Sequence, residues 1–209
     1  MTSGLPSVVD FFSGCGGTSQ GFRDAGLRIA AGLDSDLDSA ETFRGNFPEA
    51  AFIHEDIRLV TVDRVASLLP GGPLLFAGCA PCQPFSAQNQ RQNIADPRRS
   101  LLQEFSRFVT ELLPEFVVIE NVPGMQRRSG SGPLDAFIES LTLAGYATNA
   151  DVLRSLEFGV PQTRRRLVLV AALGGEPQLP APTHGDALQG PTTVRSAIEG
   201  LPSLSLIHI

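Results

Sequence analysis

Apolar and polar residues alternate along the chain in short blocks that fit strands and helices in turn. Runs rich in β-branched and aromatic residues at 7–13, 74–77 and 116–119 are typical of buried strands. Residues 100–113 carry apolar side chains at the three- and four-residue spacing of one helix face. The full pattern predicts strands at 7–13, 28–33, 51–54, 74–77, 116–119, 146–153 and 167–172, and helices at 18–25, 37–43, 61–69, 100–113, 134–143 and 194–198.

This alternation predicts an α/β fold with a doubly wound, mostly parallel sheet and helices on both faces. Ligands of such sheets bind outside the carboxyl ends of the strands. Polar or glycine residues that follow predicted strands are the turn at 14–17, Asp34, Asp56, Cys82 and Glu120. We therefore expect one functional site at this edge, next to a long polar loop at 78–97.

The distribution of charge limits the kinds of partner. The net charge is −6, which argues against a protein that holds nucleic acid by bulk charge alone. All 16 basic residues are arginine. Residues 1–66 contain ten acidic residues and five arginines, whereas residues 82–166 contain ten arginines and nine acidic residues. The acidic first third suits a neutral or cationic ligand, and the arginine clusters suit phosphate or a base edge; scattered surface charge is the structural alternative.

The sequence also indicates a compartment. No apolar run approaches the roughly 20 residues that cross a bilayer, and the first residues lack the basic and apolar regions of a secretory signal. Three cysteines cannot form a disulfide framework. We expect a cytoplasmic protein without membrane contact.

The glycine-rich turn at 14–17 resembles a nucleotide-cofactor turn, with Asp34 placed to accept hydrogen bonds from ribose hydroxyls. Asp56 after the next strand strengthens the case for an adenosine-containing ligand. The dinucleotide fingerprint is incomplete, because Ser19 stands where its third glycine belongs. The absence of lysine counts against a phosphate-binding P-loop, and a purely structural turn is the alternative.

The spacing of Cys79 and Cys82 invites a redox interpretation, but Pro84 would break the helix that such a motif needs. A zinc site lacks a second pair of ligands, so no metal is expected. Cys82, amid polar neighbours, is the candidate nucleophile. We expect Cys15 and Cys79 to be small buried hydrophobic residues.

Two further segments carry candidate chemistry. Glu120 follows an apolar strand, where it is either a helix cap or a solvated strand end, or a proton donor or acceptor that faces a cysteine. Arg164 and Arg166 alternate on an extended segment, so both side chains could reach one site.

Taken together, these residues resemble the DNA (cytosine-5) methyltransferase family, whose fold is the Rossmann-like S-adenosylmethionine-dependent methyltransferase fold. The matching elements span residues 8–170. In order they are Asp10-Phe-Phe-Ser-Gly-Cys-Gly-Gly17, Asp34, Asp56-Ile57, Pro81-Cys-Gln-Pro-Phe-Ser86, Asp96-Pro-Arg-Arg-Ser-Leu101, Glu120-Asn-Val122 and Gln162-Thr-Arg-Arg-Arg166.

The resemblance implies a DNA (cytosine-5)-methyltransferase in which the Cys82 thiolate adds to carbon 6 of a flipped-out cytosine. Glu120 would contact ring nitrogen 3 and the exocyclic amine, and Arg164 and Arg166 would steady the base. The cofactor-binding residues that it implies for S-adenosylmethionine are Phe12, Ser13, Gly14, Cys15, Gly16, Gly17, Asp34, Ser35, Asp56, Ile57, Pro81 and Leu101. The substrate-binding residues that it implies are Gln83, Ser86 and Gln162.

Family members continue into a target-recognition domain, so the resemblance implies a truncated member with weak or no activity alone. The expected domains are a catalytic and cofactor-binding domain at 1–175 and an extension at 176–209 toward a missing recognition domain. The expected partners are DNA and a cognate restriction endonuclease system, with the chain a monomer. The alternatives are cytosine-5 methylation of tRNA, a non-catalytic fragment, and a dinucleotide oxidoreductase, which would leave Cys82 without a role.

Overall fold

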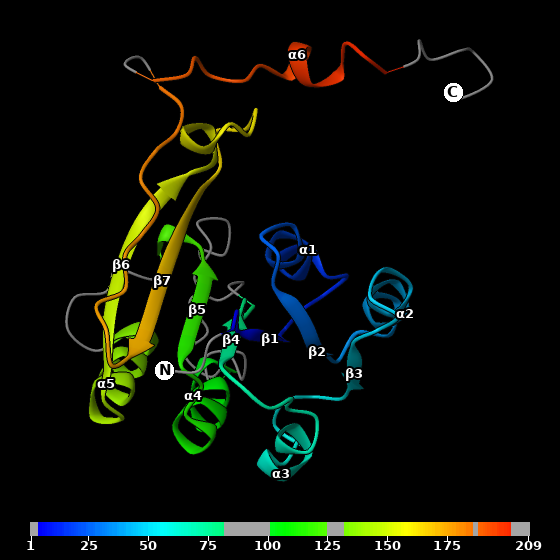
Figure 1. The fold of residues 1–209 in the computed structure, drawn as a ribbon, viewed down its shortest axis with the longest axis vertical. Coiled ribbons are helices and arrows are strands. Elements are labelled where there is room, and N and C mark those ends of the chain that lie inside the picture. The colour runs from blue at the N-terminus through cyan, green and yellow to red at the C-terminus, as the bar shows by residue number, and fades with distance from the viewer. Residues whose placement is uncertain (1–3, 82–100, 125–131, 186–187, 202–209) are drawn as a thin grey trace, which may run out of the picture. The chain divides into compact units, whose positions relative to one another are not determined.

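The computed structural model describes residues 4–81, 101–124, 132–185 and 188–201, in which strands and helices alternate from β1 to β7 (Figure 1). The α/β prediction is confirmed. The strands are β1 (Ser7–Phe11), β2 (Arg28–Asp34), β3 (Ala51–His54), β4 (Leu74–Gly78), β5 (Phe116–Asn121), β6 (Tyr146–Arg154) and β7 (Arg165–Leu173). The helices are α1 (Gly17–Asp24), α2 (Leu37–Asn46), α3 (Val62–Ala66), α4 (Leu101–Leu112), α5 (Pro133–Leu143) and α6 (Val194–Ile198), with a 3-10 helix at Ser155–Phe158.

The strands form one seven-stranded sheet in the order β3-β2-β1-β4-β5-β7-β6. β1 is parallel to both β2 and β4, β2 is parallel to β3, and β4 is parallel to β5. β7 runs antiparallel to β5, with Val168 opposite Glu120. The sheet is therefore mostly parallel, as predicted. The order of strands reverses between β1 and β4, which is where a ligand binds in a sheet of this type.

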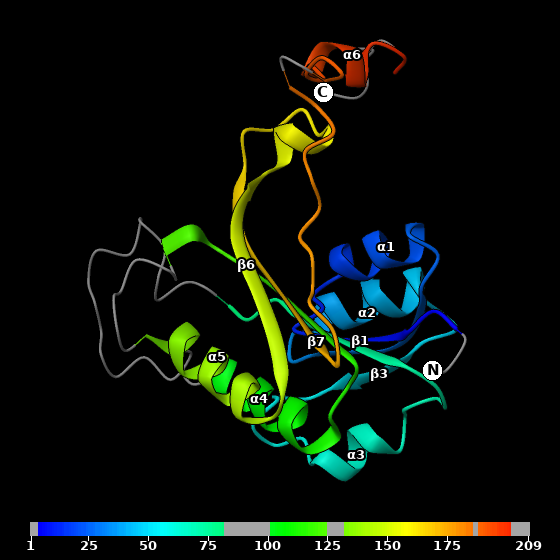
Figure 2. The ribbon, with the colours of Figure 1, turned by 60° about the vertical axis from the view of Figure 1, so that its left-hand side comes forward.

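Successive residues of β1 point to opposite faces of the sheet and build two cores. Val8 packs with Phe43 of α2 on one face. Phe11 lies on the other, with its ring centroid 5.1 Å from those of Phe105 and Phe108 of α4. In Figure 2, α1 and α2 accordingly lie over one face, and α4 and α5 over the other. Each buried phenylalanine side chain is worth roughly 1.5–3 kcal/mol.

Two elements end two or more residues earlier than their sequence predicts. The first strand stops at Phe11 rather than residue 13, because Phe12 has a φ of +60° and turns the chain out of the sheet. The helix expected at 61–69 is α-helical only from Val62 to Ala66. Leu68 and Leu69 donate instead to carbonyls three residues back, which is a tighter turn than an α-helix.

The chain divides into two compact units, Met1–Asp151 with Leu167–Leu179, and Val152–Arg166 with Pro180–Ile209. In the second unit, Glu157 O accepts hydrogen bonds from the backbone N–H groups of Thr183 and His184, both at 2.9 Å. The division into a catalytic domain at 1–175 and an extension at 176–209 is a functional one and stays a prediction.

The helices of the described ranges are short. The longest, α4, has 12 residues. None is long and apolar enough to cross a membrane, for which about 20 apolar residues are needed.

Packing between β2 and α2 predicts opposite effects for two glycines. A Cβ on Gly32 would lie 2.5–2.9 Å from three ring atoms of Phe43, whereas one on Gly45 would meet nothing within 4 Å. We expect Gly32→Ala to lower the free energy of unfolding by about 1–3 kcal/mol. Gly45→Ala, within α2, should leave it unchanged or raise it by up to about 1 kcal/mol. Urea unfolding checks both, and equal values for the two variants would contradict this packing.

Candidate cofactor-binding and active site

The site begins at the turn after β1, whose backbone takes positive φ at three residues. The angles are +60° at Phe12, +52° at Gly14 and +94° at Gly16. A Cβ on Gly16 would lie 2.4 Å from Phe47 Cε2, so no larger residue fits there. A phenylalanine in this region is strained by about 1–3 kcal/mol, and such residues cluster at ligand-binding sites.

Asp34, at the end of β2, holds this turn in place. Its Oδ2 accepts a hydrogen bond from Gly14 N–H at 2.8 Å, and its Oδ1 accepts one from Asp36 N–H at 3.0 Å. Ser13 N–H adds a bond to Leu33 O at 3.1 Å. A carboxylate has about four acceptor positions, so Asp34 keeps capacity for donors of a ligand.

A cavity of about 290 Å³ opens beside this turn, close to the lower end of the ~300–1,000 Å³ typical of ligand pockets. Seven of the predicted cofactor residues line it: Phe12, Asp34, Ser35, Asp56, Ile57, Pro81 and Leu101. Four lining residues were not predicted: Leu33, Glu55, Arg58 and Cys79. The other predicted cofactor residues, Ser13, Gly14, Cys15, Gly16 and Gly17, form the adjoining turn and do not line the cavity.

Arg58 is the most informative of the unpredicted lining residues. Its Nε donates to Asp56 Oδ1 at 2.9 Å, its Nη2 pairs with Oδ2, and its backbone N–H donates to Oδ1 at 3.0 Å. These hydrogen bonds hold the pKa of Asp56 below its ordinary value, so the carboxylate is ionised at neutral pH. An arginine two residues after the acid, in a turn, is the only sequence signal for this contact.

A second carboxyl group, Asp10, is buried beneath the turn. Ser19 Oγ donates a hydrogen bond to Asp10 Oδ2 at 2.6 Å. Ser19 is the residue that stands in place of the third glycine of a dinucleotide fingerprint. Burial raises the pKa of Asp10 from 3.8 to about 7. Among the described residues, neither Asp10 Oδ1 nor the buried Ser13 Oγ has a hydrogen-bond partner.

The three cysteines have different surroundings. Cys15 is exposed, so the prediction of burial is wrong. Its carbonyl accepts a hydrogen bond from Asn46 Nδ2 at 3.2 Å. Cys79 is partly buried at the cavity, 3.3 Å from Thr18 Oγ1. Burial, together with the Asp10 charge, raises its pKa to about 12, so its thiol stays protonated at neutral pH. Cys82 lies outside the described residues.

The ends of β4 and β5 are joined next to the cavity. Asn121 is 2% exposed, and its Nδ2 donates to Ala80 O at 3.0 Å. Glu120 lies beside Cys79, where its backbone N–H hydrogen-bonds to the thiol and its charge acts on the thiol pKa. The structure thus brings Glu120 to the strand ends that carry the cavity. Asn121 belongs to the Glu120-Asn-Val122 motif, but nothing in its sequence spacing signals this contact with Ala80.

The remaining predicted site residues are not among the described residues that line this cavity. Gln83 and Ser86, like Cys82, lie outside the described residues. Gln162, Arg164 and Arg166 belong to the second compact unit, where Arg164 O accepts a hydrogen bond from Ser155 N–H at 2.9 Å. No cluster of three or more His, Cys, Asp or Glu among the described residues could hold a metal ion.

The chain has a Rossmann-like fold. A glycine turn at the strand-order reversal, an acid at the end of the next strand and an acid-lined cavity together form its candidate site for a nucleotide-type cofactor. The family model for C-5 cytosine-specific DNA methylases matches residues 7–203. The chain belongs to this family.

Curated relatives support the assignment. The chain is 37% identical over 194 residues to the type II methyltransferase M.AquIA of a Picosynechococcus strain, covering 87% of this chain and 78% of the relative. It is 33% identical to M.SacI of Streptomyces achromogenes, covering 98% of this chain and 60% of the relative. For M.XorII of Xanthomonas oryzae the identity is 36%, with 94% of this chain and 46% of the relative covered.

Solved structures have the same fold. A structure described as a DNA modification methyltransferase encoded within an E. coli prophage superposes with a TM-score of 0.80 at 27% identity, covering 96% of this chain and 56% of that one. Spodoptera frugiperda DNMT2 gives a TM-score of 0.69 at 20% identity, covering 90% of this chain and 57% of that one. The chain therefore spans little more than half the length of both.

Burial of Asp10 predicts a pH-dependent stability. Between its unfolded pKa of 3.8 and its folded pKa of about 7, the unfolded chain releases a proton that the folded chain retains, so stability falls as pH rises. The full loss, on the order of 4 kcal/mol, is reached above pH ~7. Asp10→Asn should remove this decline, so that its stability relative to the wild type rises from about pH 4.5 to 8. Urea unfolding across this range measures it.

The test compares how the free energy of unfolding changes with pH in Asp10→Asn and in the wild type. The buried amide of the new asparagine shifts the whole curve by a constant amount, which does not depend on pH. Glu41→Gln, on the exposed surface of α2, is the matched control and should follow the wild type. Parallel curves for Asp10→Asn and the wild type would show that Asp10 is ionised in the folded protein throughout.

Proposed function

We propose that this chain transfers a methyl group from S-adenosylmethionine to carbon 5 of cytosine in DNA, with Cys82 as the nucleophile. One observation carries the proposal: the acid-lined cavity is bordered by Pro81 and Leu101. Pro81 directly precedes Cys82, and Leu101 is where the described chain resumes. The segment with the candidate nucleophile therefore leaves and rejoins the described structure at the cofactor cavity.

The lining of the cavity fits the cofactor. Phe12, Leu33 and Ile57 offer apolar surface for a flat adenine ring. The carboxylates of Asp34 and Asp56 can accept hydrogen bonds from the ribose hydroxyls and the adenine amine. The negative charge of these groups favours a sulfonium cation over an anionic dinucleotide. When bound, S-adenosylmethionine supplies an electrophilic methyl group.

The roles of the chain's own residues follow from the weak nucleophilicity of cytosine carbon 5. The Cys82 thiolate would add to carbon 6 and move the electron pair of the 5,6 double bond to carbon 5, which would make carbon 5 nucleophilic toward the methyl group that the cofactor would supply. Glu120 holds the proton at ring nitrogen 3 and accepts from the exocyclic amine. Loss of the carbon 5 proton to a base re-forms the double bond and expels the thiolate.

The contrast between the cysteines supports this assignment. A thiol with a pKa of about 12 supplies almost no thiolate at neutral pH, so Cys79 does not fit the role although it lines the cavity. Cys15 lies on the turn and not among the lining residues. Cys82 is the remaining candidate of the three cysteines in the sequence.

DNA as the substrate is supported by the relatives named type II methyltransferases. In this proposal Arg164, Arg166 and Gln162 of the second unit contact the extruded cytosine, together with Gln83 and Ser86. A restriction endonuclease with the same target is the proposed functional partner.

Calorimetric titration with S-adenosylmethionine tests the cofactor site. We expect binding to the wild type, and about 10–100-fold weaker binding to Asp34→Asn, because hydrogen bonds to a charged group are worth roughly 1.5–3 kcal/mol. Asp38→Asn, on the exposed side of α2, should bind like the wild type. Equal affinity of all three proteins, or no binding to the wild type, would refute the assigned site.

Covalent trapping tests the nucleophile. With S-adenosylmethionine present and a target-recognition domain supplied, duplex DNA substituted with 5-fluorocytosine should form an adduct with the wild type that survives denaturing electrophoresis. After methylation, fluorine at carbon 5 cannot leave as a proton does, so the thiolate is not expelled. Cys82→Ser should abolish the adduct and keep cofactor binding. Cys15→Ser and Cys79→Ser are matched controls that should still form it. An undiminished adduct with Cys82→Ser would show that another group attacks.

A further inference from the structure

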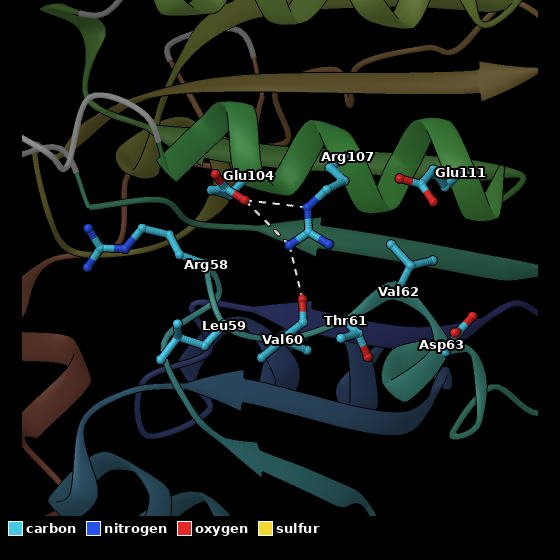
Figure 3. A pocket seen from close by; sticks show the side chains of 9 residues that line it. All are labelled: Arg58, Leu59, Val60, Thr61, Val62, Asp63, Glu104, Arg107 and Glu111. Atoms are coloured by element: carbon cyan, nitrogen blue, oxygen red, sulfur yellow. Dashed lines mark hydrogen bonds and ion pairs between the residues drawn. The ribbon is translucent and has the colours of Figure 1, made fainter.

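Arg107, on the outer face of α4, reaches across to the loop after β3. Its Nη2 donates to the carbonyl oxygens of Val60 at 3.0 Å and Ile57 at 3.2 Å. Figure 3 shows its guanidinium between α4 and this loop, in a groove that Glu104 and Val60 also line. Its side chain is 31% exposed, so both carbonyl contacts lie at the edge of the packed interior.

The loop that Arg107 contacts carries the wall of the cofactor cavity. It folds into consecutive turns, with Leu59 N–H donating to Asp56 O at 2.8 Å and Val60 N–H to Ile57 O at 3.3 Å. Asp56 and Ile57 line the cavity on one side of the loop, while the carbonyls of Ile57 and Val60 face Arg107. The guanidinium of Arg107 therefore supports the loop from the side opposite to the cavity, directly behind Asp56 and Ile57, the residues that we propose contact the adenine.

Glu104 is the other partner of Arg107, but its contribution is smaller. Its Oε2 lies 3.4 Å from both Nε and Nη2, and both side chains are about one-third exposed. Solvent screens an ion pair of this kind. The hydrogen bonds to the two carbonyls are shorter and join segments 47 and 50 residues apart, so they tie the loop to α4.

We propose that Arg107 is a positioning residue for the nucleoside end of the cofactor site: it holds residues 57–60 against α4 and thereby fixes Asp56 and Ile57 at the cavity. Because α4 also contributes Leu101 to the cavity, Arg107 keeps two walls at a constant separation. The inference rests on the proposed function for its effect on affinity, but its effect on the loop does not depend on any ligand.

Arg107→Gln is the main variant for the affinity test. If the loop then spends only about a tenth of its time in the binding geometry, the dissociation constant for S-adenosylmethionine rises about tenfold. Arg107→Lys, which can still reach a carbonyl, should recover part of this loss. Glu104→Gln and Glu111→Gln, in the same groove, should stay within about twofold of the wild type.

Trypsin measures the loop directly, because the chain has no lysine and Arg58 lies inside the loop. Without ligand, Arg107→Gln should raise the initial rate of cleavage after Arg58 at least about fivefold. Cleavage after the exposed Arg28 and Arg44, read by mass from the same digest, should not change. General loss of stability would instead accelerate all three sites.

The two readouts separate the inference from the proposed function. If the wild type does not bind S-adenosylmethionine, the proposed function fails, while cleavage after Arg58 still decides whether Arg107 holds the loop. If the wild type binds, faster cleavage confined to Arg58 with weaker binding supports the positioning role. Unchanged cleavage and affinity in Arg107→Gln, or equal acceleration at all three sites, would overturn it.

Discussion

The carboxylate of Asp34 joins the ends of two neighbouring strands, and the shape of the site depends on this contact. It accepts backbone hydrogen bonds from Gly14 after β1 and from Asp36 before α2. The turn after β1 can then adopt the left-handed backbone of Gly14 and Gly16, and Phe12 is held in a strained conformation at the cavity. Without an acceptor at this position, the turn would lose the hydrogen bond that sets its distance from β2.

Carboxyl groups are concentrated at this edge of the sheet, and their surroundings give them different protonation states. Asp56 is kept ionised by Arg58, whereas the buried Asp10 holds its proton up to a pH of about 7 and hydrogen-bonds to Ser19. Burial also keeps the thiol of Cys79 protonated. The cavity therefore presents carboxylates to a ligand while the adjacent interior stays close to neutral, which suits a cationic cofactor.

The connections behind the site hold its walls together over long separations in sequence. Asn121 ties the end of β5 to Ala80 at the end of β4, 41 residues earlier. Phe47 closes on Gly16 from the end of α2, and Arg107 reaches the loop after β3 from α4. None of these side chains lines the cavity. Each holds a residue that lines it, forms its turn or, for Ala80, lies between two lining residues. The site is built by packing as much as by its lining residues.

Local sequence determined the order and type of the elements, because the spacing of apolar residues along one segment is enough to favour a strand or a helix. It also placed Asp34 and Asp56 directly after strands, and the resemblance to the family added Phe12, Ile57, Pro81 and Leu101. All six residues line one cavity. Tertiary structure decided what depends on distant neighbours: the exposure of Cys15, the pairing of Asp10 with Ser19, the early end of β1 at Phe11 and the contacts of Arg107 with the loop after β3. The burial and hydrogen bonding of a side chain depend on which other segments pack around it. The spacing of apolar residues within one segment does not show which segments those are.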